Sequence, residues 1–197
     1  MIIRKLFRVE SGHVVRNATS YRCSHSYHGH SAVIEVFFEG RQLDNAQMLM
    51  DFGLMKGAIK DFIDSMDHTM ILCGKDDPKC INFFKEVNDR YIILPFNPTA
   101  EMLSIFIMHY VNRILSNTRF NNGEGYIRCV NVEYNETATG MARCDGADEA
   151  INWKDEWEDE IIFSDGVKKD WSKELKDFIE TGKYIINPII EQQINLS

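Results

Sequence analysis

The 197-residue sequence has little of what marks several large classes of protein. With 22 Lys and Arg against 30 Asp and Glu, its formal net charge is −8, so it lacks the basic excess of nucleic-acid binders. No apolar run approaches the roughly 18 to 20 residues of a membrane span, and the N-terminus lacks the hydrophobic core of a signal peptide. The five cysteines have no framework-like spacing, which predicts reduced thiols. We therefore expect a cytoplasmic protein with no nucleic-acid and no membrane partner.

Two common nucleotide-binding motifs are also missing. The sequence contains neither G-x-G-x-x-G nor G-x-x-x-x-G-K-[ST], so nothing in it predicts a nicotinamide cofactor. What is present is the composition of a globular protein, with 44% hydrophobic and 26% charged residues. The length suits one domain with a full core and an appendage.

Acidic residues are concentrated between positions 145 and 165. This segment carries nine acidic residues and one basic residue, so the rest of the chain is neutral in sum. The change predicts a domain at 1–144 followed by an acidic extension at 145–197. Trp153 and Trp157 stand four residues apart, and a helical pattern follows near 167–181. We expect the extension to dock on an outer face of the domain through its tryptophans.

Hydrophobic residues in the domain recur with two periods. A 3.6-residue stripe predicts helices at 52–66, where Asp51 can cap, and at 103–115, after Pro98-Thr99. We expect residues 73–97 to be irregular. Period-two alternation predicts strands at 3–10, 31–39, 126–134 and, briefly, 141–143. Two strands, two helices and two more strands, in this order, indicate an α+β fold with an antiparallel sheet and both helices on one face.

Three histidines could converge on one point. His28 and His30 open a predicted strand, where residues two apart face the same side, and His13 ends the strand before it. Three neutral imidazoles with an open fourth position are the donor set of catalytic zinc. An isolated His-x-His pair can equally be two surface histidines. His25 is an additional histidine nearby, which we interpret as a loop residue.

Four further residues could carry chemistry. Cys23 could be a reactive thiol or a small buried hydrophobe. Asp67 could orient the imidazole of His68, or His68 could simply interact with the end of its helix. Glu136 could receive two parallel N–H groups from a flat heterocycle, or it could be a solvated acid at a strand end.

Six short motifs follow one another within the first 143 residues. They are Ser11-Gly12-His13, Cys23 with His28-Gly29-His30, Met50-Asp51-Phe52, Met66-Asp67-His68, Asn97-Pro98-Thr99-Ala100-Glu101 and Asn135-Glu136-Thr137. In this order they resemble the 6-pyruvoyl-tetrahydropterin synthase / 6-carboxytetrahydropterin synthase family. They are most like its bacterial 6-carboxy branch, which makes a queuosine precursor.

The resemblance implies a fold and an assembly. The fold would be the tunnelling fold, a four-stranded antiparallel sheet with two helices on one face, here followed by the acidic and helical extension. Members of the family form trimers and hexamers with active sites at subunit interfaces. We therefore expect a homo-oligomer.

The resemblance also implies roles for individual residues. His13, His28 and His30 would bind Zn²⁺, and Cys23 would abstract a proton. His68, supported by Asp67, would be the second acid/base group. Glu136 would anchor the pterin ring, and Thr99 lies in a segment that helps to bind it.

The implied substrate is 7,8-dihydroneopterin triphosphate. The product would be 6-carboxy-5,6,7,8-tetrahydropterin, with release of acetaldehyde and triphosphate. Four residues separate Cys23 from His28, whereas the 6-carboxy branch usually has three and the pyruvoyl branch five. A 6-pyruvoyl product or a related side-chain cleavage therefore remains an alternative, and a noncatalytic pterin-binding module is a second one.

Overall fold

The computed structural model describes residues 1–187, so the last ten residues of the predicted extension lie outside the described residues. Its centre is a mixed seven-stranded sheet in the order β7-β6-β2-β1-β3-β4-β8, and β5 and β9 form a separate parallel pair. The strands are β1 Ile2–His13, β2 His28–Gly40, β3 Thr69–Cys73, β4 Tyr91–Leu94, β5 Thr118–Arg119, β6 Ile127–Thr137, β7 Gly140–Asp145, β8 Ile162–Phe163 and β9 Ile185–Ile186. The helices are α1 Tyr21–His25, η1 Leu54–Lys56, α2 Ala58–Asp64, α3 Pro78–Val87, α4 Ala100–Ser116, α5 Gly146–Asn152, η2 Asp155–Glu160, α6 Asp165–Lys168 and α7 Lys173–Thr181.

Four of the strands form the predicted antiparallel part of the sheet. β1 pairs with β2 from Ile2 opposite Glu39 to His13 opposite His28, and β6 and β7 continue the sheet beyond β2. Alternate residues of β2 are buried, including Ile34, which is the pattern of a sheet with one covered face. The period-two reading of these segments is confirmed.

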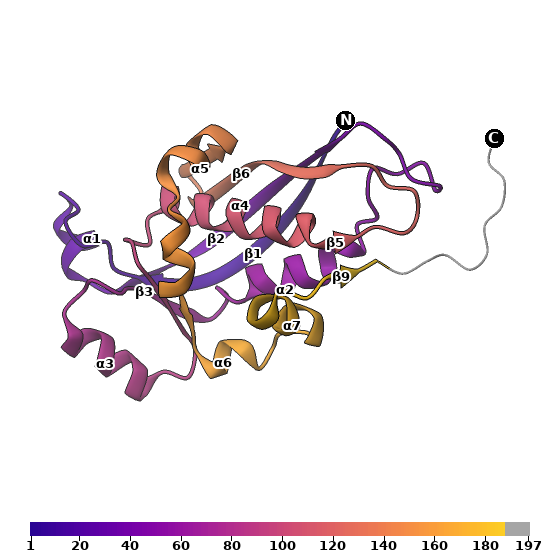
Figure 1. Ribbon diagram of the computed structural model, residues 1–197. Coiled ribbons are helices and arrows are strands. Elements are labelled where there is room, and N and C mark those ends of the chain that lie inside the picture. Colours follow the sequence, from indigo (N-terminus) through magenta and orange to yellow (C-terminus); the bar gives the residue numbers. More distant parts are fainter. Residues whose placement is uncertain (188–197) are drawn as a thin grey trace.

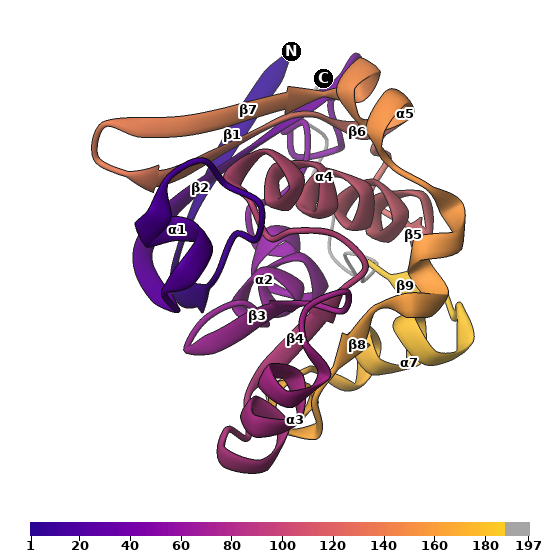
Figure 2. The ribbon, with the colours of Figure 1, turned by 90° about the vertical axis from the view of Figure 1, so that its left-hand side faces the viewer.

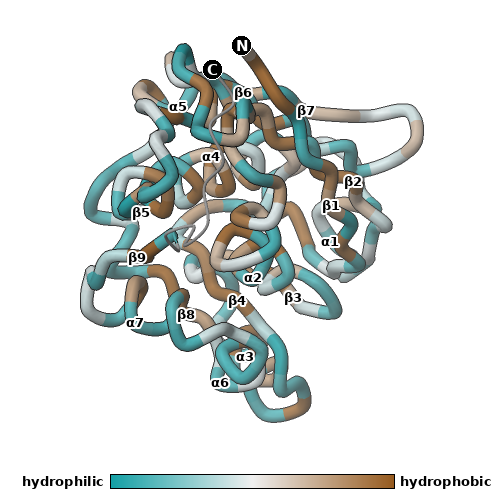
Figure 3. The backbone as a smooth tube through the Cα atoms, turned by 90° about the vertical axis from the view of Figure 1, so that its right-hand side faces the viewer, coloured by the Kyte–Doolittle hydropathy of each residue, from teal (hydrophilic) through white to brown (hydrophobic). Residues whose placement is uncertain are grey.

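The prediction of a four-stranded, purely antiparallel sheet is wrong in strand number and in pairing. β3 lies parallel to β1, β4 lies parallel to β3, and β8 pairs antiparallel with β4. β4 reads Tyr-Ile-Ile-Leu and is buried almost throughout, so it shows no alternation. Figure 3 shows it as a hydrophobic stretch. Short apolar runs of this kind cannot be assigned from periodicity. For the same reason the segment 73–97, expected to be irregular, contains α3 and β4.

The two main helices lie on the same face of the sheet (Figure 1). Phe62 of α2 stacks on Tyr110 of α4, with ring centroids 4.7 Å apart, and its side chain is fully buried. Thr99 caps α4 by accepting a hydrogen bond from Met102 N–H at 3.2 Å. The predicted helix at 52–66 is interrupted at Gly57, which separates η1 from α2. A buried aromatic such as Phe62 contributes about 3–5 kcal/mol relative to alanine.

The extension packs on the helical side of the molecule (Figure 2). Trp153 stacks on His109 at 4.0 Å, Trp157 lies 4.9 Å from Phe96, and the indole N–H of the buried Trp171 donates to the Ser65 hydroxyl at 2.7 Å. Docking through tryptophans is therefore confirmed. The single helix predicted near 167–181 is instead two helices, α6 and α7. Among the described residues, no helix has both the length and the apolar character to cross a membrane.

Candidate active site

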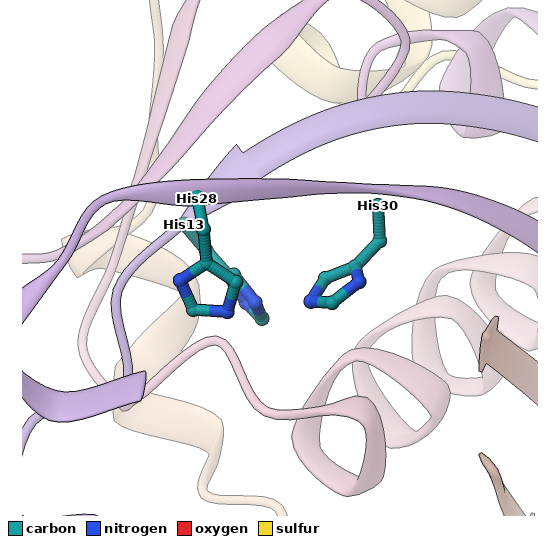
Figure 4. Close-up of side chains that lie close together, drawn as sticks. All are labelled: His13, His28 and His30. Carbon is teal, nitrogen blue, oxygen red and sulfur yellow. The ribbon is translucent and has the colours of Figure 1, made fainter. Parts of the chain in front are cut away.

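Three histidine side chains meet where β1 ends and β2 begins (Figure 4). His13 lies directly opposite His28 in the strand pair, and His30 follows two residues later on the same face of β2. The ring centroids are 4.7 to 5.1 Å apart. One nitrogen of each ring lies within 4.8 Å of the others. Strand register and the period of two thus bring together the three histidines predicted from sequence.

Backbone carbonyl groups orient two of the rings. Nδ1 of His13 lies 2.7 Å from the carbonyl oxygen of Pro98, and Nδ1 of His28 lies 2.9 Å from that of Ser26. A carbonyl only accepts hydrogen bonds, so in both rings Nδ1 carries the proton and Nε2 keeps its lone pair. Metal-binding histidines are commonly oriented in this way.

The buried Nε2 atom of His13 has no hydrogen-bond partner among residues 1–187. A buried polar atom without a partner is costly, and a bound cation would satisfy it. Burial lowers the pKa of the His13 imidazole. The Pro98 carbonyl and the Glu136 carboxylate act to raise this pKa, but burial outweighs them. The neutral form is the one that binds metals. The three residues therefore fit a metal ion, and three imidazoles are a donor set that catalytic zinc sites use.

Glu136 and Thr99 lie beside this cluster. Glu136 Oε1 lies 3.6 Å from Nε2 of His13 and 3.9 Å from Nε2 of His30, with the carboxylate partly exposed. Thr99 follows Pro98, so the segment that caps α4 also orients His13. Glu136 is thus placed to accept N–H groups of a ligand next to the histidines.

Cys23 lies in α1, in the connection between β1 and β2. The cluster of metal-ligand atoms found among residues 1–187 does not include it. Its carbonyl accepts a hydrogen bond from Val15 N–H at 2.9 Å, which holds α1 near the end of β1. His25, on the same helix, stacks on Tyr21 at 4.3 Å and is likewise outside the cluster.

Asp67 and His68 form a hydrogen-bonded pair in the turn before β3. Nδ1 of His68 lies 2.9 Å from Asp67 Oδ2, and the imidazole is largely exposed. Partial burial acts to raise the pKa of Asp67, but hydrogen bonds from Glu10 N–H and from His68 outweigh it and hold this pKa below its usual value. His68 has φ of 51°, a left-handed conformation that costs a non-glycine residue about 1–2 kcal/mol.

The Asp67–His68 pair is separate from the three-histidine cluster. The group of metal-ligand atoms found among residues 1–187 consists of His13, His28 and His30 and does not include His68. A cleft of about 490 Å³ is lined by His68 and Glu10 and also by residues 28–31 of β2, which include two of the histidines. Within one chain, Glu136 thus lies 3.6 and 3.9 Å from two histidine nitrogens, whereas His68 borders the cleft outside the cluster.

Sequence reasoning missed a residue that connects the parts of this site. Arg16 donates to Asp76 at 2.9 Å and to the carbonyl of Ser24, next to Cys23, at 2.8 Å. Its backbone exchanges two hydrogen bonds with the side chain of Asn97. These partners are up to 81 residues away, and nothing in the local pattern around Arg16 indicates them.

The chain was compared with known proteins. A family model described as 6-pyruvoyl tetrahydropterin synthase matches residues 2–147. The 6-carboxy-5,6,7,8-tetrahydropterin synthase of Helicobacter pylori strain J99 is 37% identical over 180 residues, which cover 90% of this chain and 89% of that protein. The one from Aquifex aeolicus is 34% identical over 158 residues, 71% of this chain and 94% of that protein. The Helicobacter match extends past the end of the family model, so part of the extension has a counterpart there.

Solved structures share the fold. An uncharacterized protein from Wolinella succinogenes aligns with a TM-score of 0.60 at 21% identity, covering 74% of this chain and 98% of that one. The 6-pyruvoyl tetrahydropterin synthase of Caenorhabditis elegans aligns with a TM-score of 0.51 at 18% identity, covering 74% and 95%. The motif order, the folded domain and the match over residues 2–147 agree, and the chain belongs to the 6-pyruvoyl tetrahydropterin synthase family.

Proposed function

We propose that the protein is a zinc-dependent 6-carboxytetrahydropterin synthase. It would convert 7,8-dihydroneopterin triphosphate and water to 6-carboxy-5,6,7,8-tetrahydropterin, acetaldehyde and triphosphate, as a step of 7-deazapurine and queuosine biosynthesis. The observation that carries the proposal is the convergence of three oriented imidazoles around the unpartnered Nε2 of His13. The names of the relatives at 34 to 37% identity favour the 6-carboxy product.

In this proposal, metal binding, proton transfer and pterin binding are assigned to different residues. His13, His28 and His30 would hold the metal, and in His13 and His28 a backbone carbonyl at Nδ1 leaves Nε2 free for it. Zinc bound there supplies Lewis acidity, which polarises the side-chain hydroxyls of the substrate and makes the adjacent C–H groups more acidic. Cys23 takes a proton from the side chain, and His68, oriented by Asp67, exchanges protons from the opposite side. Glu136 accepts N–H groups of the pterin ring.

The reaction balances without an external oxidant or reductant. The ring gains the two hydrogens that convert the dihydro to the tetrahydro form, and the side-chain carbon attached to it becomes the carboxylate. The remaining two carbons leave as acetaldehyde when the carbon–carbon bond breaks and triphosphate departs. The acid/base groups therefore need only move protons.

A homo-oligomer, a trimer or hexamer, is part of the proposal. It is supported by the absence of His68 from the group of metal-ligand atoms found among residues 1–187. In an oligomer, a second copy of the chain would supply the His68 that faces the three histidines.

The test is to incubate the purified protein with 7,8-dihydroneopterin triphosphate and to measure its zinc content in the same sample. Acetaldehyde and 6-carboxytetrahydropterin in equal amounts would support the proposal. A 6-pyruvoyl product would indicate the related synthase, and binding of pterin without turnover would indicate a binding module. Cys23→Ala should abolish turnover with zinc retained, whereas the matched variant Cys80→Ala, at another partly buried cysteine, should keep it.

A further inference from the structure

Arg90 connects the Asp67–His68 pair to the C-terminal extension. Its guanidinium donates twice to the carbonyl oxygen of Asp67, at 3.1 and 3.2 Å, and once to that of Asp64, at 3.3 Å. On its other side, Nη1 donates to the carbonyl of Gly166 at 3.1 Å and to Asp170 Oδ2 at 2.5 Å. The planar fork of arginine thus links the end of α2 to α6 and the residue just beyond it.

Trp171 makes a second link from the extension to the same turn. Its indole N–H donates to the hydroxyl of Ser65 at 2.7 Å, and both groups are buried. The carbonyl of Ser65 accepts a hydrogen bond from the Thr69 hydroxyl at 2.8 Å, and this hydroxyl also lies 2.9 Å from the carbonyl of Asp67. The indole therefore binds Ser65, and Ser65 in turn is hydrogen-bonded to Thr69, the residue that follows His68.

The turn is also held by the sheet and by backbone hydrogen bonds such as Asp67 N–H to the carbonyl of Asp64 at 3.0 Å. On the sheet side, His68 N–H donates to the carbonyl of Glu10 at 2.7 Å, and Glu10 N–H donates to Asp67 Oδ1 at 2.7 Å. On the opposite side lies a cavity of about 340 Å³, which Asp67, His68, Arg90 and Trp171 line together. A left-handed residue persists only where its surroundings define it, and here the extension contributes to those surroundings through Trp171 and through its bonds to Arg90.

We propose that the extension is a working part of the active site, with Arg90 and Trp171 as positioning residues that hold the Asp67–His68 pair in its reactive orientation. The inference rests on the proposed function, in which this pair exchanges protons with the substrate. A positioning role for Trp171 differs from a purely packing role. The indole ring packs on Phe163, whereas the indole N–H group donates to Ser65 in the turn.

Two conservative variants separate positioning from packing. Trp171→Phe keeps an aromatic ring but loses the N–H donor and part of the indole, and Arg90→Lys keeps the charge and loses the fork. The matched control is Lys169→Ala, which removes an exposed ion pair with Asp89 in the same segment and touches neither the turn nor Arg90. All three are measured as full-length, zinc-loaded protein.

We expect both test variants to lower kcat by about three- to thirtyfold, while KM changes less than about twofold and zinc content is unchanged, since small misplacement of a reacting group is enough to cost such factors. Lys169→Ala should match the wild type. The second readout is amide hydrogen exchange at residues 66–69, which should accelerate in the test variants and not in the control. This readout needs no turnover.

The outcomes separate the inference from the proposed function. Wild-type kcat in both variants, with or without a lower melting temperature, would overturn the inference and leave the proposed function intact. If the wild type turns over no pterin, the proposed function fails, and hydrogen exchange then decides the inference alone: unchanged exchange at 66–69 in the variants overturns it.

Discussion

The three histidines and the Asp67–His68 pair are held in place by different means. The histidines stand on two paired strands, and backbone carbonyls orient two of their rings. The pair lies in a turn with a left-handed residue, and side chains from distant parts of the chain support it. Strand register places the three histidines, with one long-range partner at Pro98, whereas the Asp67–His68 pair lies in a turn held mainly by side chains from other segments. The predictions below test this contrast, starting with the largest expected effect.

Replacing one of the three ligands should abolish metal binding. We expect His28→Ala to lose zinc affinity by more than about a hundredfold, because loss of even an outer hydrogen-bond partner costs about 10- to 100-fold. The control is His25→Ala, since His25 lies outside the cluster. Zinc content by atomic absorption checks both. Full zinc occupancy in His28→Ala would contradict the assigned ligand set.

Asp67→Asn should impair catalysis while leaving the metal in place. An amide cannot accept from both Glu10 N–H and His68 in the way the carboxylate does, so we expect kcat to fall by about 10- to 100-fold, as for other mis-oriented catalytic imidazoles. Zinc content should not change. If the variant lost zinc, the two parts of the site would be coupled and the contrast drawn above would be wrong.

The same carboxylate should also give a pH-dependent stability difference. Its pKa is lower in the folded protein than the usual value of 3.8, so ionised Asp67 stabilises the fold above that pH. The contribution disappears as pH falls through the lowered pKa. The melting temperatures of wild type and Asp67→Asn should therefore differ at neutral pH, begin to approach each other as pH falls below about 3.8, and meet below the lowered pKa. A difference in melting temperature that stays constant across this pH range would argue against stabilisation by the contacts of Asp67 with Glu10 N–H and His68.

Metal removal should loosen one region only. A chelator should lower the melting temperature, because a ligand present at a thousandfold its dissociation constant stabilises by about 4 kcal/mol. The fold should survive, since the core is made of sheet and helix side chains. Hydrogen exchange should accelerate at the start of β2 and remain unchanged at residues 66–69. Equal acceleration at both places would show that the turn depends on the metal.

The smallest effect is expected in the first half of the extension. Glu158 lies 2.7 Å from Nε2 of His109 and 2.8 Å from Arg113, far along the chain from the turn. We expect Glu158→Gln to cost up to about 1 kcal/mol, as for partly exposed ion pairs, with kcat unchanged. Thermal unfolding and steady-state kinetics check this. A large fall in kcat would mean that the whole extension, rather than its Arg90 and Trp171 links, supports catalysis.

The parts of the molecule that were predictable from sequence share a physical reason. Alternation within β1 and β2 predicted the strands, and the same period of two placed His28 and His30 on one face. The pairing of Asp67 with His68 followed from their adjacency. By contrast, β4 is buried on both faces and carries no periodic signal.

The long-range links were not predictable. Arg90 is 23 residues from Asp67 and 80 residues from Asp170, and Trp171 is 106 residues from Ser65. No local pattern encodes such distances. The acidic composition of the extension did predict a distinct segment, but it did not indicate that part of this segment would touch the turn at His68.

β8 has a consequence for solubility. Its two residues pair with Ile92 and Ile93 at the outer edge of the apolar strand β4. An uncovered edge of that composition is a template for strands of other molecules, and proteins generally protect such edges. By pairing with β4, β8 thus protects this edge from intermolecular β-aggregation. It belongs to the same extension as Trp171, which contacts the turn before His68.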